Sequence, residues 1–136
     1  MNSERWIQVT AALGASSVEA MVEAASQLHR EADLEDVPRL LELLQSDNFF
    51  AREAAAWPLA ELAGPNVLSE LFSAYQRGFD EGHDNDGFTA ALLEIPSLHP
   101  LQAKSALLSI VGVANEPMLG HAKWLLEFCP AKGAAP

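Results

Sequence analysis

The chain has 136 residues, of which 49% are hydrophobic, and this length and composition suit one globular domain with its own core. Its 19 acidic residues outnumber the 8 lysines and arginines and give a formal net charge of −11. Nucleic acid is excluded as the expected ligand, because phosphate backbones are bound by clustered Lys and Arg, which the sequence lacks. The negative field favours encounter with a basic protein, although acidity that merely keeps the protein in solution explains the charge equally well.

Membrane and metal sites are also disfavoured by the sequence. No segment approaches the roughly 20 apolar residues of a membrane-spanning helix, and the first residues lack the pattern of a secretory signal. The single cysteine, Cys129, can form neither an internal disulfide nor a multi-cysteine zinc site. The histidines lack the spacing of metal ligands. We therefore expect a cytoplasmic protein with no metal, no cofactor and no membrane contact.

Apolar residues recur at helical spacing along the whole chain, and no stretch alternates polar and apolar residues as a strand would. Residues 1–32 are expected to form an N-terminal capping pair of helices. The first helix lies near residues 4–13. The second begins at a capping-box pattern, Ser16 with Glu19 three residues later, and runs to about Arg30.

Residues 33–129 are predicted to form three further helix pairs. In the first pair, a helix with one apolar face is followed by a turn at 46–48 and by a partner helix over about 49–63. The second and third partners are expected over about 87–98 and 117–129. The apolar positions that recur in the three first helices are Val37, Leu40, Leu41 and Leu44; Leu68, Leu71, Phe72 and Tyr75; and Leu107, Leu108 and Val111.

A helix pair of this size cannot bury its apolar face alone, so stacked neighbours would complete one continuous core. The sequence therefore predicts an all-α fold, a short right-handed α-solenoid of about four antiparallel helix pairs, with residues 130–136 as a flexible tail. Pro58 and Pro96 fall inside predicted helices and are expected to kink or end them. A compact orthogonal bundle is the alternative, since any leucine-rich helices can look weakly alike.

Residues 36–63 carry the most specific pattern in the chain. Val37-Pro38 is followed by leucine pairs, Asp47 lies in the turn, and Arg52 lies early in the second helix. This segment resembles one HEAT repeat. The resemblance implies that Asp47 and Arg52 tie adjacent repeats together.

The resemblance to HEAT repeats extends over about residues 34–129 but weakens towards the end. The third pair has Leu119-Gly120 where the family often has Val-Arg, so its stacking is expected to rest on apolar contact. The family consists mainly of scaffolds and binding modules. Some relatives are bilin-handling lyases, and others resemble DNA glycosylases, which need a basic groove that this chain lacks.

An acidic loop is the first candidate binding site. A calcium loop is disfavoured, because its register would place Gly82 and Leu93 where carboxylates are required. A solvated loop in which Asn85 or Asp86 caps the next helix is the plain interpretation. The functional hypothesis is an acidic edge that meets a basic partner. Its carboxylates are Asp80, Glu81, Asp84 and Asp86.

Aromatic residues supply the second set of candidates. Phe50 and Trp57 lie two turns apart on one flank of a predicted helix, and they either pack against the neighbouring repeat or form a partner-binding patch. His121 and Trp124 share one side of the last helix. Either the C-terminal tail covers these two, or they meet another chain, which could be a partner protein or a second copy in a homodimer.

These features predict a non-catalytic protein-interaction module with no catalytic residues. A sharper expectation is an immunity or inhibitor protein that occludes the cationic cleft of a basic toxin. A generic scaffold subunit and a chromophore-lyase-like enzyme are the alternatives. The enzyme would require a deep pocket with convergent polar groups, whereas a flat groove without perturbed titratable residues would argue against it.

Overall fold

The computed structural model describes residues 1–130, and this range is all-α. It contains eight α-helices and two short 3-10 helices but no strand, which confirms the all-α part of the prediction. The tail predicted at 130–136 lies outside the described residues except for Pro130. No helix in the described range has the length and apolar character needed to cross a membrane.

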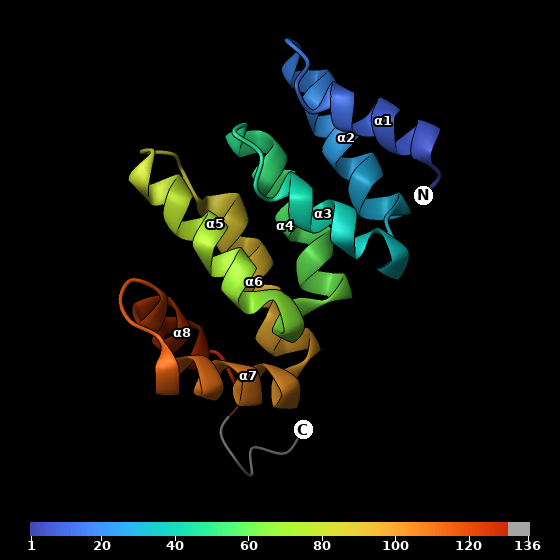
Figure 1. Cartoon of the computed structure of the whole chain (residues 1–136). Coiled ribbons are helices and arrows are strands. Elements are labelled where there is room, and N and C mark those ends of the chain that lie inside the picture. Colours follow the sequence, from blue (N-terminus) through green and yellow to red (C-terminus); the bar gives the residue numbers. More distant parts are fainter. Residues whose placement is uncertain (131–136) are drawn as a thin grey trace.

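All eight predicted helices are present, and short connections join them (Figure 1). The α-helices are α1 (Ser3–Ala12), α2 (Val18–Glu31), α3 (Val37–Leu43), α4 (Phe49–Leu62), α5 (Leu68–Asp80), α6 (Asp86–Leu98), α7 (Pro100–Val113) and α8 (Met118–Leu126). The 3-10 helices are η1 (Leu34–Asp36) and η2 (Gly64–Val67), and each leads into the α-helix that follows it.

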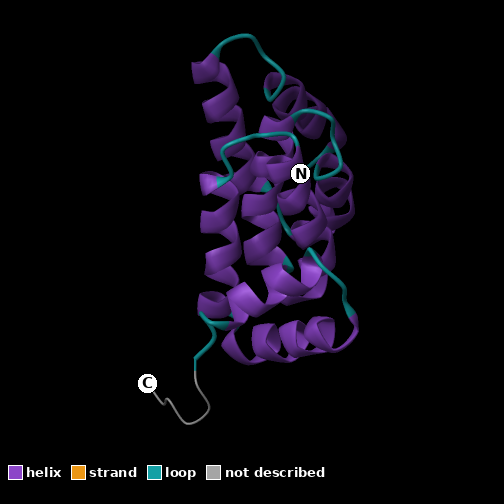
Figure 2. Ribbon diagram, turned by 90° about the vertical axis from the view of Figure 1, so that its left-hand side faces the viewer, coloured by secondary structure: helices purple, strands orange, loops and turns teal. Residues whose placement is uncertain are grey.

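The helices pack both along the sequence and across it. Neighbours in sequence contact each other in the combinations α1 with α2, α3 with α4, and α7 with α8. In addition, α2 packs on α4 and α4 packs on α6, so these three helices form a continuous row. Figure 1 shows α1 to α6 side by side, whereas α7 lies across the lower end of the array, and Figure 2 shows the same crosswise helix at the bottom.

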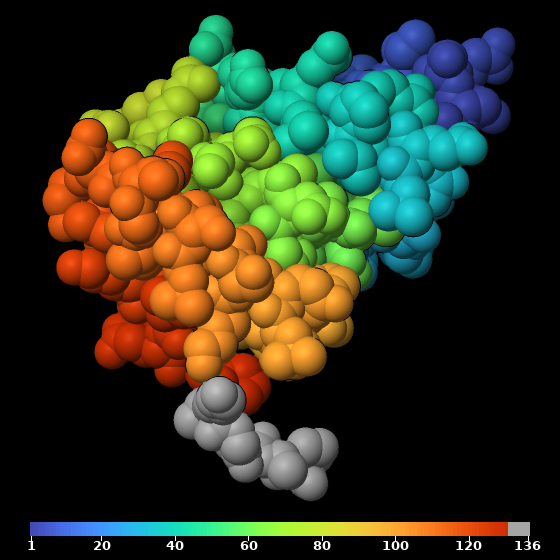
Figure 3. All heavy atoms as spheres, turned by 60° about the horizontal axis from the view of Figure 1, so that its bottom comes forward, coloured from blue at the N-terminus to red at the C-terminus, as the bar shows by residue number. Residues whose placement is uncertain are grey.

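The last helix pair closes one end of the molecule. α7 contacts the end of α6 and the 3-10 helix η2, and α8 folds back against α5 and α6. Seen from this end, the residues of α7 spread over the front of the molecule (Figure 3).

The centre of the core is α4, which contacts α2, α3 and α6 and is apolar on almost every side. Its small side chains allow the neighbouring helices to approach closely. The largest buried apolar side chains beside it are Phe72 of α5 and Phe88 of α6. The buried alanines of α4 are Ala51, Ala54, Ala55, Ala56 and Ala60.

Short polar side chains begin three of the α-helices, α1, α2 and α4, because the first N–H groups of a helix lack partners within it. The Asn48 side chain accepts a hydrogen bond from the Ala51 N–H at 3.2 Å and so begins α4 after the predicted turn. At α2 the capping residue is Ser17, whose hydroxyl accepts from the Ala20 N–H at 3.3 Å. The predicted cap at Ser16 is therefore wrong by one residue.

Two prolines lie inside helices of the central row. Pro58 is buried in α4 and Pro96 is buried in α6, and both helices continue beyond them, to Leu62 and Leu98. Each proline lacks the N–H that would bond to the carbonyl one turn earlier, but neither one ends its helix.

A buried arginine connects the turn before α4 to the end of α5. The Arg52 side chain is fully buried, and its Nη1 donates to the carbonyl oxygens of Ser46 at 2.9 Å and Asp47 at 3.3 Å. Its Nη2 forms an ion pair with Glu81. The Asp47 carboxylate pairs instead with Arg77 of α5, at 2.9 Å. Arg52 and Asp47 thus both link neighbouring helix pairs, as the resemblance implies, through separate partners.

Candidate functional site

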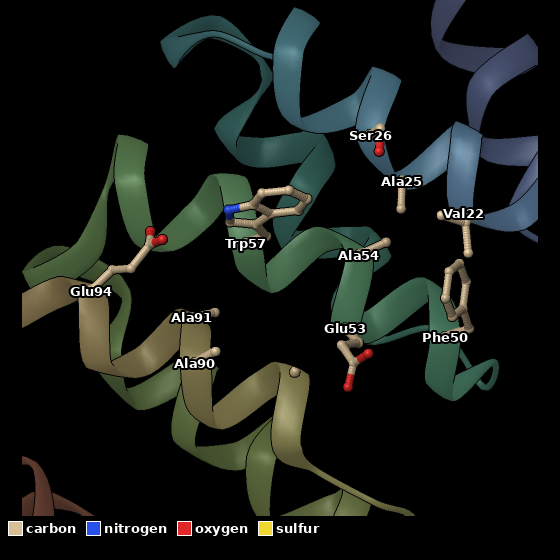
Figure 4. A pocket seen from close by; sticks show the side chains of 11 residues that line it. Val22, Ala25, Ser26, Phe50, Glu53, Ala54, Trp57, Ala90, Ala91 and Glu94 are labelled. Carbon is tan, nitrogen blue, oxygen red and sulfur yellow. The ribbon is translucent and has the colours of Figure 1, made fainter.

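A groove with a volume of about 380 Å³ lies on the face that α2, α4 and α6 share (Figure 4). Alanines and a glycine on α4 and α6 leave room for it, and no Lys or Arg lines it. Its lining residues are Val22, Ala25 and Ser26 of α2; Phe50, Glu53, Ala54 and Trp57 of α4; and Gly87, Ala90, Ala91 and Glu94 of α6.

Trp57 forms one wall of the groove and is held by a stacked histidine. The indole ring lies against the His29 ring with centroids 3.7 Å apart and planes 11° apart. The His29 Nε2 atom is 2.8 Å from Oε1 of Glu61 on α4. Because these contacts fix the ring while 37% of the residue stays exposed, Trp57 offers a preformed apolar surface to a ligand.

The two flank aromatics predicted from sequence both line this groove. Phe50 is half-buried and faces Val22 of α2, and Trp57 lies further along α4 (Figure 4). Trp57 therefore packs against His29 of the neighbouring helix α2 and also borders the groove, and the partner-binding patch stays a prediction.

Glu53 lies at the α6 end of the groove, where it meets the start of that helix. Burial raises the pKa of the Glu53 carboxyl, the charges of Asp84 and Asp86 raise it further, and the Phe88 N–H opposes them. A Cβ atom on Gly87 would come within 2.7 Å of the Glu53 Cδ atom, so the glycine makes room for this carboxyl. Glu53 thereby supplies an acceptor to a helix whose own N-cap side chain does not cap it.

A second carboxyl, Glu94 of α6, borders the groove beyond Trp57. Burial raises the pKa of Glu94, and so do a hydrogen bond to Glu61 and the negative charge of Glu61, whereas His29 lowers it. The Glu94 Oε2 atom is buried without a hydrogen-bond partner. Glu61 and Glu94 therefore form a carboxyl pair that a shared proton or a cation would stabilise.

A histidine lies beside this carboxyl pair. His99 borders a second, more open depression together with Glu61 and Glu94, and its Nε2 atom is buried without a partner. Its ring packs against Gly64, whose φ of +32° and close approach to the imidazole both disfavour a larger residue. Within residues 1–130, no three His, Cys, Asp or Glu side chains are arranged to hold a metal ion.

Two carboxylates of the acidic loop already have partners within the chain. Glu81 pairs with Arg52 and with Arg77, and these hydrogen bonds lower the pKa of Glu81 to about 2. Asp80 accepts a hydrogen bond from Nε2 of Gln76 at 2.8 Å. Glu81 therefore holds the helices together rather than presenting a free charge.

The other two loop carboxylates lie nearer to the groove. Asp84 and Asp86 are exposed, and their charges reach Glu53 and raise its pKa. Asn85 between them is buried and donates to the Tyr75 carbonyl at 2.8 Å, so its side chain does not cap α6. His83 stacks on the Phe49 ring at a centroid distance of 4.3 Å.

His121 and Trp124 lie apart from the groove lining, between α8 and α5. The His121 Nε2 atom is 2.8 Å from Oε1 of Gln76, and the ring stacks near Phe72. Trp124 stacks on Tyr75 with a centroid distance of 6.0 Å. Both predicted binding residues are half-buried and pack within the chain.

The carboxyl groups of the groove were not among the residues predicted from sequence. Glu53, Trp57 and Glu61 follow one another at intervals of four residues on α4, which places them on one flank of that helix. This strip of two acidic residues and one aromatic residue is the sequence pattern that could have indicated the groove carboxyls. Glu94 and His29 join it only through helix packing, so no local spacing indicates them.

Comparisons with models of protein families, with curated proteins and with solved structures found no match to this chain. The HEAT resemblance and the function that it implies therefore stay predictions.

Proposed function

We propose that this chain is a non-catalytic protein-binding module that holds a basic segment of another protein in the groove between α2, α4 and α6. One observation carries the proposal. Trp57 lies between two carboxyls, Glu53 and Glu94, while Phe50 lies beyond Glu53, and no Lys or Arg lines the groove.

A lysine or arginine side chain matches this arrangement chemically. Its apolar stem would pack on the Trp57 ring while its charged head meets the carboxyls, which is how such side chains bury their methylene groups. The unpartnered Oε2 atom of Glu94 would accept a hydrogen bond from that head. The ligand would also relieve the repulsion between Glu94 and Glu61, which otherwise raises the pKa of Glu94.

The finer architecture that we propose is the HEAT-like right-handed α-solenoid of helix pairs. The contacts of α1 with α2 and of α3 with α4, together with the row of α2, α4 and α6, support it. In this arrangement the groove lies on the inner row, where α-solenoids commonly bind partners. The crosswise direction of α7 is a departure from regular stacking.

The charge of the chain supports a basic partner and a narrower proposal as well. A net charge of −11 would attract a cationic surface and speed its association. An inhibitor or immunity protein that covers the cationic cleft of a toxin is the narrow form of this proposal, and a scaffold subunit is the broad form.

The proposal can be tested with short peptide probes and NMR. We would titrate the labelled full chain with Ac-Gly-Leu-Arg-Leu-Gly-amide and with the same peptide carrying citrulline in place of arginine. The expected result is a shift of the Trp57 indole N–H with the arginine peptide, and at least fivefold weaker binding of the citrulline peptide. Binding should weaken as NaCl increases, because the attraction is electrostatic.

A matched pair of variants tests whether the arginine peptide binds at Glu94. Glu94→Lys should abolish binding of the arginine peptide, whereas Glu127→Lys makes the same charge change at the exposed residue that follows α8 and should have little effect. If both variants lost peptide binding equally, the net charge of the chain rather than Glu94 would be responsible. Equal binding of the two peptides would contradict the proposal.

A chromophore-lyase-like enzyme is the second candidate, and one observation favours it. The groove has two carboxyls whose pKa is raised, Glu53 and Glu94, and a general acid needs such a shift. Incubation with a free bilin separates the two candidates. An absorbance change of the bilin that Glu94→Gln removes and Glu127→Lys keeps would favour the enzyme.

A further inference from the structure

The outward side of α7 is an apolar surface at one end of the molecule. Leu101 and Leu108 lie two turns apart on it and are 80% and 53% exposed, and Val113 at the end of the helix is 85% exposed. Ser105 and Gly112 lie on the same strip and are also exposed. Figure 3 shows this helix spread across the end of the molecule.

This surface is the least acidic part of a strongly acidic chain. No Asp or Glu occurs between Glu94 and Glu116, although the chain has 19 acidic residues. The one lysine of α7, Lys104, is half-buried, and its charge acts on the Cys129 thiol, which places it on the side towards the end of α8. The exposed strip of α7 therefore carries no formal charge.

Contacts within the described chain do not account for this apolar strip. A Cβ atom on Gly112 would meet nothing within 4 Å, so the fold itself does not require a glycine there. The hydrophobic side chains of α7 that pack inward are others, such as the buried Ala103 and Leu107. Contiguous apolar surface of this kind marks interaction sites in proteins.

We propose that the outward strip of α7 is a self-association surface on which a second copy of this chain packs about a twofold axis. Electrostatics favours this occupant. Two chains that each carry a net charge of −11 repel each other, and a face without carboxylates is where they can meet at the lowest cost. A basic partner, in contrast, would gain nothing from this uncharged face.

A twofold arrangement suits a single helix of this length. Each α7 would pack along the other, with Leu101 and Leu108 of one copy against the small residues Ser105 and Gly112 of its partner copy. A helix of 14 residues is only about 20 Å long, so the contact is at the small end of specific interfaces. We therefore expect a weak dimer with a Kd of roughly 10 to 100 µM.

Salt provides a direct test, because it screens the repulsion between the two anionic chains. Sedimentation velocity on the full chain, from 5 to 500 µM, should show a monomer–dimer equilibrium. Association should strengthen several-fold between 50 and 500 mM NaCl. Binding of a basic peptide in the groove has the opposite salt dependence, so failure of one proposal is distinguishable from failure of the other.

Two variants test the surface independently. Leu108→Glu adds repelling charges, and Gly112→Gln adds bulk at a position where the monomer has open space. Both should remain monomeric at 500 µM in 500 mM NaCl. Ile7→Glu on α1 is the matched control, since Ile7 is also an exposed apolar residue, and it should dimerise like the unmodified chain.

The outcomes that overturn the proposal are clear-cut. A single monomeric species of the unmodified chain at 500 µM and 500 mM NaCl would contradict the proposal. Equally, a dimer that persists in both Leu108→Glu and Gly112→Gln would use another surface. Circular dichroism melting curves would identify any variant that fails to fold, and the remaining variant would then decide.

Discussion

The first helices of the chain and its last helix pair are held in place by different forces. Every ion pair within residues 1–130 involves residues no later than His83, and residues 84–130 contain none. α8 is joined to α5 largely by stacked rings, such as Trp124 on Tyr75. The first helices are therefore linked by ion pairs, whereas α8 is held by stacked rings and by the hydrogen bond between His121 and Gln76.

The difference shows how directional contacts fix the packing of helices. A guanidinium fork such as Arg52 must align with two carbonyl oxygens and a carboxylate, so it restricts the position of α4 relative to α5. Apolar and aromatic contacts tolerate more orientations. The crosswise α7 occurs in the part of the chain that has no ion pairs.

The largest expected effect comes from removing the buried guanidinium. Arg52→Met should lower the free energy of unfolding by about 3 kcal/mol, because two backbone carbonyls and Glu81 would each lose the hydrogen bond from the buried guanidinium. Urea unfolding would measure the loss. Arg30→Met is the control, since Arg30 and Glu23 form an exposed pair, and it should cost less than about 0.5 kcal/mol. Equal losses would remove the distinction between the buried and exposed arginines.

The packing of Trp124 between α8 and α5 should contribute somewhat less to the free energy of unfolding than Arg52 does. Trp124→Ala should lower the free energy of unfolding by about 2 kcal/mol, because the ring is half-buried against Tyr75 and Phe128. The loss should be the same in 50 mM and 500 mM NaCl, since no charge is involved. Binding of a basic peptide in the groove should be unchanged. A variant of full stability that no longer bound the peptide would instead place Trp124 in the binding surface.

Helices and turn contacts could be predicted well from the sequence because their causes are local. The spacing of Val37, Leu40 and Leu44 defines one helix face, whereas the link through Asp47 and Arg52 was implied by the resemblance of this segment to a HEAT repeat. Their partners, Arg77 and Glu81, could not be predicted, because they meet only when α5 packs beside the turn.

The candidate site was predicted only in part, for the same reason. Phe50 and Trp57 share a flank of one helix, so their common surface follows from helical spacing. The carboxyls of Glu61 and Glu94 come from two helices, and the raised pKa of Glu94 depends on burial and on Glu61, neither of which local spacing describes. Glu81 was misjudged as a free charge because a loop carboxylate cannot be distinguished from an ion-pair partner without the fold.

The smallest expected effects come from pH, and they should separate the two regions again. Burial lowers the pKa of His121 below its usual value of 6.5, so the unfolded chain takes up this proton more readily than the folded chain does. Stability from His121 is therefore present above pH 6.5 and falls as the pH drops below it. Glu81, with its pKa lowered to about 2 from 4.5, contributes stability above pH 4.5 that is lost only between there and pH 2.

Acidification should consequently loosen the contact between α8 and α5 first, while the ion pairs around Glu81 persist. Hydrogen exchange of backbone amides, compared at pH 7.5 and 5.5 after correction for the intrinsic rate, should show a selective loss of protection in α8. His121→Gln keeps a side chain that can hydrogen-bond to Gln76 but cannot take up a proton, so its α8 should lose less protection. Glu81→Gln should not change the comparison in this range. Uniform loss along the chain would show instead that the two ends open together and that the difference in their contacts does not make them separate units.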